Sequence, residues 1–194
     1  MVYIVEHIDD FDLPTALADI SEQRRQQALR FRHERGQRTC VLAYLLLKKA
    51  LREEYGIGGN PTFEYGEHGK PRLAEHPDIH FSLSHCREAV VCAVGRRPVG
   101  IDVESVSRYK EPLAVYAMND GERAEIMAAE RPDVAFARLW TMKEARLKLT
   151  GEGIAGNLKT ALDDGHRWRF TTVERLERNY IYTLCEPRTE SYNF

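Results

Sequence analysis

The chain has 194 residues and a formal net charge of −2; 43% of its residues are hydrophobic and 30% are charged. This length suits one large domain or two small ones, and the composition is that of a globular protein rather than a disordered one. The near-neutral charge argues against a nucleic-acid-binding protein, and the longest apolar runs are far too short to span a bilayer.

The cysteines and the N-terminus point to a protein of a reducing compartment. Four cysteines occur without a CxxC pair or the spacing of a metal site: Cys40, Cys86, Cys92 and Cys185. We therefore expect buried free thiols. The first ten residues lack the basic segment and the long apolar segment of a signal peptide, so the sequence predicts a cytoplasmic protein without a membrane association.

The first half of the chain is expected to contain both strands and helices. Ser21 can cap a short helix that ends near residue 29, and a broad apolar stripe predicts a long helix at 34–55 that Gly56 can end. Strands are predicted at 2–6, 62–65, 80–85 and 88–95, and a loop at 9–14.

A turn at 95–98 separates two halves, which we place at residues 1–97 and 98–194. The strand at 99–104 is the expected hairpin partner of the strand before this turn. The remaining expected elements are a loop at 105–112, a helix at 119–130 capped by Asn119 or Asp120, a helix from Asp133 to Thr150 ended by Gly151, strands at 168–173 and 180–185, and a frayed end at 189–194.

The stretch VGIDVE at 99–104 carries the most informative pair of acids. Asp102 and Glu104 are two residues apart, so both carboxylates lie on the same face of the predicted strand. Neighbouring carboxylates repel each other, and a divalent cation such as Mg²⁺, which prefers oxygen ligands, would remove that conflict. Two surface acids on a solvated edge strand explain the pair alone equally simply.

A second charged cluster falls in the helix predicted at 133–150. Glu144 and Lys148 are spaced i and i+4, so they share one helix face. They could form an ordinary surface ion pair, or they could add a third carboxylate and an ammonium to one charged site. Glu122 occupies the first turn of the preceding helix, where a capping role explains it well.

Three further segments could contact a phosphate. The turn at 66–71 combines glycines with Lys70, and Ser84 and His85 end a predicted strand. Each segment also has an ordinary structural explanation, as a hairpin turn or as sheet-edge groups. Adjacent residues of a strand point apart, so Ser84 and His85 make a poor hydrolytic dyad. Arginines near residues 24–38 could bind phosphate at a helix start or face solvent.

Five motifs stand in a fixed order along the chain. They are GKP at Gly69–Pro71, FSLSH at Phe81–His85, GIDVE at Gly100–Glu104, NDGE at Asn119–Glu122, and WTxKEAxxK followed by GxG at Trp140–Gly153. Their order and spacing resemble the 4′-phosphopantetheinyl transferases, specifically the larger, surfactin-synthetase-activating type. The resemblance covers about residues 21–153. Ser82 stands where the family often has asparagine, and Asn119 where it often has serine or threonine.

The resemblance implies a fold and an activity. The fold is α+β, a pseudo-dimer of two similar α/β halves with coenzyme A in the cleft between them, which in turn implies a monomer. The activity moves the 4′-phosphopantetheine arm of coenzyme A onto a serine of an apo acyl or peptidyl carrier protein. It depends on Mg²⁺ and releases adenosine 3′,5′-bisphosphate.

The resemblance also implies roles for individual residues. It puts Asp102, Glu104 and Glu144 on the metal and Lys148 near the diphosphate. The residues implied to bind the rest of coenzyme A are Gly69, Lys70, Pro71, Ser84 and His85, with Arg25 or Arg38 on the 3′-phosphate. For the base that accepts the serine proton, Glu144 is the first candidate and Glu122 the second.

Two other classes of function remain compatible with the same residues. A metal-dependent hydrolase of a nucleotide or diphosphate would use these carboxylates with water as the nucleophile. A non-catalytic module would hold coenzyme A or a carrier domain without turnover. Release of bisphosphate without a carrier protein would favour the hydrolase, and coenzyme A binding that ignores Mg²⁺ would favour the module.

Overall fold

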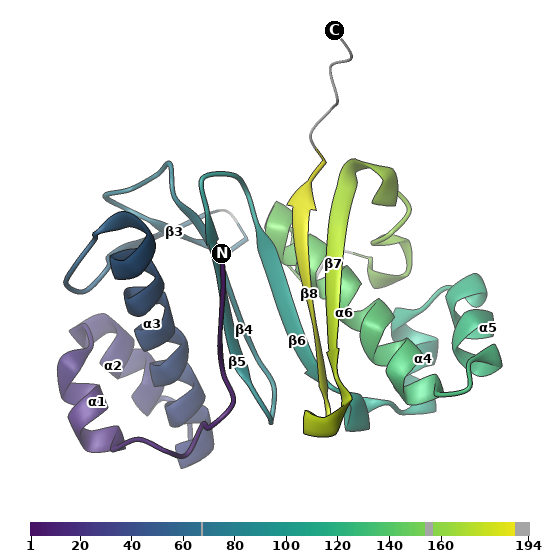
Figure 1. Ribbon diagram of the computed structural model, residues 1–194, viewed down its shortest axis with the longest axis horizontal. Helices are drawn as coiled ribbons and strands as arrows, with labels where there is room; N and C mark the ends of the chain where they lie inside the picture. The colour runs from purple at the N-terminus through teal and green to yellow at the C-terminus, as the bar shows by residue number, and fades with distance from the viewer. Residues whose placement is uncertain (67, 154–156, 189–194) are drawn as a thin grey trace, which may run out of the picture.

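Two three-stranded antiparallel sheets pack against each other at the centre of the protein, and helices cover the outer side of each sheet (Figure 1). The computed structural model describes residues 1–66, 68–153 and 157–188. The end predicted to fray, 189–194, therefore lies outside the described residues. Within those ranges, no helix combines the length and the apolar character needed to cross a membrane.

The N-terminal half builds the first sheet, in the order β1-β5-β4. Its elements are β1 (Val2–Val5), α1 (Leu13–Asp19), α2 (Glu22–Leu29), α3 (Glu34–Tyr55), β2 (Phe63–Tyr65), β3 (Pro71–Leu73), β4 (His80–His85) and β5 (Val90–Gly95). The strands β2 and β3 form a separate hairpin. The predicted helix at 34–55 is confirmed, and Gly56 ends it in the left-handed conformation with φ 69°.

The C-terminal half builds the second sheet, in the order β6-β8-β7. Its helices and strands are β6 (Gly100–Ser105), α4 (Glu111–Ala117), α5 (Asp120–Ala128), α6 (Pro132–Thr150), β7 (Trp168–Arg175) and β8 (Tyr180–Pro187). Short 3-10 helices lie at Val106–Arg108, Leu158–Thr160, Gly165–Arg167 and Leu176–Arg178.

The two halves share one topology. In each, the first strand pairs with the last strand, and the last strand pairs with the one before it. In each, a long helix, α3 or α6, precedes the final two strands and packs on the sheet. The predicted α+β class with two similar halves is therefore confirmed.

Alternating side chains on the strands build the layers. Val90, Cys92 and Val94 of β5 pack toward α3, whereas Val91 and Ala93 on its opposite face join the core between the two sheets. The strand β6 contributes Ile101 and Val103 to that central core. Its other face, which carries Asp102 and Glu104, is therefore turned toward α6.

The strand β6 does not form the predicted hairpin with β5. The backbone of β5 already pairs with β1 on one edge and β4 on the other, so it has no edge left for β6. Serine side chains join the halves instead. The backbone N–H of Ile101 donates to Ser82 Oγ at 3.0 Å, and that of Val103 donates to Ser84 Oγ at 3.3 Å.

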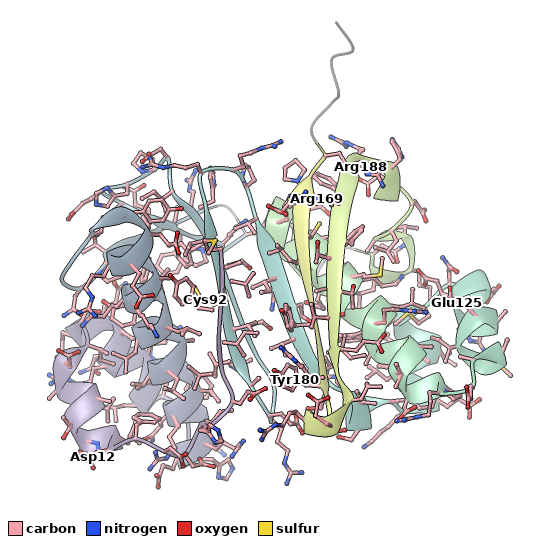
Figure 2. The ribbon with its side chains drawn as sticks, in the orientation of Figure 1. Asp12, Cys92, Glu125, Arg169, Tyr180 and Arg188 are labelled. Carbon is pink, nitrogen blue, oxygen red and sulfur yellow. The ribbon has the colours of Figure 1, made fainter. Side chains whose placement is uncertain are left out.

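A second link between the halves comes from Tyr180. Its ring is buried in the core between the two sheets, and its hydroxyl donates to Glu6 Oε1 at 2.7 Å (Figure 2). Glu6 follows β1 in the N-terminal half, so this bond ties the start of the chain to β8.

Two helices begin where loops were predicted. Within the expected loops at 9–14 and 105–112, α1 begins at Leu13 and α4 begins at Glu111. Each has a proline in its first turn, where the missing N–H costs nothing. Asp12 caps α1 by accepting from the Thr15 N–H (Figure 2). The prolines at these two positions therefore indicated the first turns of helices rather than loops.

Candidate active site

Two adjoining pockets bring most of the predicted site residues together. The first, the carboxylate pocket, has a volume of about 410 Å³, and its lining includes Ser84, His85, Asp102, Glu104, Glu144 and Lys148. The second, the glycine-rich pocket, has a volume of about 260 Å³, and its lining includes Gly69, Lys70, Pro71, Ser82, Lys148, Gly151 and Gly153. Leu83 and Lys148 line both pockets, so the pockets share a wall.

The three predicted metal carboxylates are buried and come from two elements. Asp102 and Glu104, on β6, are 5% and 9% exposed, and Glu144, on α6, is 6% exposed. The solvated edge strand considered above is therefore not what the structure shows. Carboxylates are rarely this buried without a partner, so the pocket requires positive charge.

Lys148 supplies part of that charge. Its Nζ donates to Asp102 Oδ1 at 2.6 Å and to Ser84 Oγ at 2.7 Å, and Ser84 Oγ donates to the same Asp102 oxygen at 2.7 Å. Lys148 therefore bonds across to β6 rather than forming the surface ion pair with Glu144 that its spacing also allowed. Residues from both halves meet at this point, because Ser84 belongs to β4.

Arg108 supplies further positive charge, and no motif of the sequence pointed to it. Its Nη1 lies 3.0 Å from Glu104 Oε2, and its guanidinium stands over the ring of Trp140 at 4.9 Å from the centroid. Both Arg108 and Trp140 line the carboxylate pocket. The available signal was the spacing of Arg108, four residues after Glu104, but that spacing means little without the 3-10 turn that follows β6.

Burial raises the pKa values of two of the acids. The pKa of Glu104 rises to about 7, mainly because burial disfavours its charged form. Burial, followed by repulsion from Asp102, raises the pKa of Glu144. The pKa of His85 falls, first through desolvation and then through the nearby Lys148 ammonium. Burial thus penalises the negative charge of Glu104 and Glu144 even beside Lys148 and Arg108.

The donor set fits a hard divalent cation. Within the part of the chain that the structure describes, Asp102 Oδ2 and Glu144 Oε1 are buried without a hydrogen-bond partner, and carboxylate oxygens are the ligands that Mg²⁺ prefers. As the side chains stand, no three His, Cys, Asp or Glu side chains within residues 1–66, 68–153 and 157–188 are grouped to hold a metal ion. Lys148 and Arg108 hold two of the three carboxylates instead.

We expect the metal-free protein to lose stability as the pH rises, and Glu104 to be one cause. Between about pH 4.5 and 7 the folded protein keeps a proton on Glu104 that the unfolded chain has released, so unfolding becomes easier across this window. The free energy of unfolding of Glu104→Gln, relative to that of wild type, should therefore rise by about 2 kcal/mol from pH 5 to pH 8. Urea unfolding in EDTA measures this difference.

The control for this experiment is Glu64→Gln, which removes an exposed acid from β2. Its stability relative to wild type should not change with pH. If the difference in stability between Glu104→Gln and wild type also stayed constant from pH 5 to pH 8, the pKa of Glu104 would not be raised by folding.

One lining residue of the glycine-rich pocket, Lys70, joins the two halves of the protein. Lys70, just before β3, donates from Nζ to the Leu149 carbonyl oxygen at the end of α6, at 2.8 Å. Burial lowers the pKa of Lys70 to about 8. Gly151 and Gly153, both with positive φ, leave the pocket wall without side chains. The wall can therefore approach a ligand closely.

Glu122, the second candidate for the base, lines neither of the two pockets. Glu122 Oε1 lies 2.7 Å from Nζ of the fully buried Lys143, and Oε2 accepts from the Asn119 N–H at 2.8 Å. Together with Asn119 it forms the capping box of α5. Because Lys143 directly precedes Glu144 on α6, the two side chains point to different sides of the helix. Glu122 pairs with Lys143 and therefore lies away from Glu144.

The two predicted phosphate-binding arginines are also placed elsewhere. Arg25 pairs with Glu22 of the same helix, and Arg38 pairs with Glu34 while donating to the Phe11 carbonyl oxygen at 2.8 Å. Neither lines the two pockets; Arg24 does.

Arg24 was within reach of sequence reasoning. It precedes Ala28, the buried residue of α2, by four positions, so it lies on the inward face of that helix. Its guanidinium stands over the ring of Tyr44, 5.2 Å from the centroid. The position of Arg24 on the inward face of this polar helix was the signal that could have favoured it over Arg25 as a pocket residue.

Known proteins provide an independent comparison. A model of the 4′-phosphopantetheinyl transferase superfamily matches residues 98–191. The 4′-phosphopantetheinyl transferase gsp of Aneurinibacillus migulanus is 33% identical over 88% of this chain and 72% of its own length. A 4′-phosphopantetheinyl transferase of Bacillus subtilis is 28% identical over 87% and 83%, and psf-1 of Bacillus pumilus is 35% identical over 73% and 62%. The chain therefore belongs to the 4′-phosphopantetheinyl transferase superfamily, as its motifs indicated.

Proposed function

We propose that this protein transfers the 4′-phosphopantetheine arm of coenzyme A to a serine of an apo acyl or peptidyl carrier protein. The observation that carries the proposal is the meeting of three buried carboxylates in one pocket with Lys148, which also lines the second pocket. One pocket offers glycines and Lys70 to a nucleotide, and the other offers charge to a reacting diphosphate. The relatives named above are all transferases of this kind.

Coenzyme A would lie across both pockets. Gly69, Lys70 and Pro71 would hold the adenine end, with Ser84 and His85 beside the phosphates. Arg24 replaces Arg25 and Arg38 as the candidate for the 3′-phosphate, because Arg24 lines the carboxylate pocket and they do not. Lys148 reaches both pockets and would lie against the diphosphate.

Asp102, Glu104 and Glu144 would hold Mg²⁺. When bound, the ion offsets the negative charge that builds up on the diphosphate. In the reaction, the serine oxygen forms a bond to the β-phosphorus, and the bond from that phosphorus to the bridging oxygen breaks. Adenosine 3′,5′-bisphosphate leaves with the electron pair of that bond.

The protein's own residues handle the proton and the remaining charge. Glu144 accepts the serine proton in this proposal, because it lines the carboxylate pocket beside Lys148 and its second carboxylate oxygen can act while Oε1 holds the metal. The Lys148 ammonium stabilises the charge that moves onto the leaving bisphosphate.

The proposal has further parts. The metal is Mg²⁺, and the protein acts in the cytoplasm as a monomer, because two halves of one chain already supply both sides of the site. We also divide the chain into halves at residues 1–97 and 98–194, and the change from one sheet to the other between β5 and β6 supports this division.

Mass spectrometry of an intact apo carrier protein tests the proposal. After incubation with this protein, coenzyme A and MgCl₂, the carrier should gain the mass of one phosphopantetheine, and EDTA should prevent the gain. Free adenosine 3′,5′-bisphosphate should appear in step with the modified carrier. Its release at the same rate without any carrier would instead show a hydrolase, and coenzyme A binding without turnover on acyl and peptidyl carriers would show a binding module.

A further inference from the structure

Two cationic side chains hold the carboxylates that the proposed metal needs. Lys148 Nζ lies 2.6 Å from Asp102 Oδ1, and Arg108 Nη1 lies 3.0 Å from Glu104 Oε2. Glu144 Oε1 and Asp102 Oδ2 have no hydrogen-bond partner among the described residues. The metal-free pocket thus neutralises itself in part, with its own ammonium and guanidinium.

An ammonium at Asp102 opposes a metal ion at the same carboxylate. Two cations within a few ångströms repel each other, and burial weakens the solvent screening that would relieve the repulsion. The side chain of Asp102 is only 7% exposed. A divalent cation can therefore bind well only if Lys148 gives up its bond to Asp102.

The structure offers Lys148 a second place. Its side chain is 29% exposed, and it lines the glycine-rich pocket as well as the carboxylate pocket. A diphosphate between the two pockets would attract the ammonium away from Asp102 and uncover that carboxylate. A lysine suits such a move because its charge sits at the end of a flexible chain.

We propose that Lys148 is a resident counterion of Asp102, which coenzyme A withdraws and a divalent cation replaces. The inference rests on the proposed function. It means that the metal and coenzyme A help each other to bind, and that Lys148 itself weakens metal binding in the protein without coenzyme A. The coupling is reciprocal, so the metal strengthens coenzyme A binding by the same factor.

Binding of Mn²⁺, followed by the electron paramagnetic resonance signal of the free ion, tests this without any turnover. Mn²⁺ takes the same oxygen ligands as Mg²⁺. Without coenzyme A, Lys148→Gln should bind Mn²⁺ at least about ten-fold more tightly than wild type, because Asp102 loses its competing cation. Saturating coenzyme A should strengthen Mn²⁺ binding in wild type, and by a factor at least about ten-fold smaller in Lys148→Gln.

Two matched variants control for charge and for folding. Lys148→Arg keeps a cation at Asp102 and should bind Mn²⁺ as weakly as wild type. Lys48→Gln removes a cation that pairs with Asp19 outside both pockets, so Mn²⁺ binding without coenzyme A should again match wild type. Circular dichroism confirms that each variant is folded before the titration.

The outcomes separate this inference from the proposed function. If wild type binds Mn²⁺ with coenzyme A but Lys148→Gln, without coenzyme A, binds it no more tightly than wild type, the counterion exchange is wrong and the metal site stands. If wild type binds no Mn²⁺ even with saturating coenzyme A, the proposed metal site fails, and the exchange fails with it.

Discussion

Replacing Asp102 by asparagine is expected to lower the rate of phosphopantetheine transfer by at least about 10²-fold while the protein stays folded. Asp102 is the carboxylate at which Lys148 and Ser84 meet, and its second oxygen is buried with no partner in the described ranges. An asparagine keeps the shape and one acceptor oxygen, but it removes the negative charge that a divalent cation requires.

Stability in EDTA should change far less than activity. Repulsion from Asp102 adds to the burial that raises the pKa of Glu104 and Glu144, but Asp102 also holds the Lys148 ammonium at 2.6 Å. Its replacement removes both interactions, and their effects on stability have opposite signs. The melting temperature in EDTA should therefore stay close to that of wild type.

Carrier modification measured by intact-protein mass spectrometry, together with thermal unfolding in EDTA, checks both halves of the prediction. The matched control is Asp120→Asn at the start of α5, whose carboxylate is fully exposed and pairs only with Arg123 among the ion pairs of the described residues. That control should keep the wild-type rate. An Asp102→Asn protein that modifies the carrier at more than about a tenth of the wild-type rate would contradict the assignment of Asp102 to the metal.

Features set by neighbouring residues could be predicted from the sequence. The apolar stripe and Gly56 located α3, and alternation located β4 and showed that Asp102 and Glu104 share a face of β6. These signals depend on helical and strand periodicity, which short windows of sequence contain. The five ordered motifs then led to the family.

Features set by distant residues could not be predicted in this way. The partner of β6 is β8, which follows it by some eighty residues, because both edges of β5 are occupied. The bond from Lys148 to Asp102 depends on how α6 crosses β6, and the place of Glu122 depends on a fully buried Lys143. Sequence spacing showed which charges could meet on one helix but not which would meet between elements.

The crossing of α6 over β6 depends on one glycine. A Cβ atom on Gly100 would lie 2.0 Å from the Ala145 carbonyl oxygen and 2.6 Å from the Leu149 backbone nitrogen. Both atoms belong to the backbone of α6, which cannot move aside as a side chain can. The left-handed region plays no part here, so Gly100 is required for the close approach alone.

Gly100→Ala is therefore expected to destabilise the protein by about 3 kcal/mol, a large effect for the addition of one methyl group. The helix must move away from β6 or the strand must bend, and either change separates Glu144 and Lys148 from Asp102. Misplacement of reacting groups by about 1 Å can cost about 10²-fold in rate, so transfer should also fall in the fraction that stays folded.

Urea unfolding measures the loss of stability, and carrier modification at a low temperature, where the variant is folded, measures the loss of rate. Gly165→Ala is the control, because a Cβ atom there meets nothing within 4 Å. Its stability should stay within about 0.5 kcal/mol of wild type. If Gly100→Ala were as stable and as active as Gly165→Ala, α6 would not lie against β6 as described. The position of Lys148 beside Asp102, on which the proposed chemistry depends, would then be wrong as well.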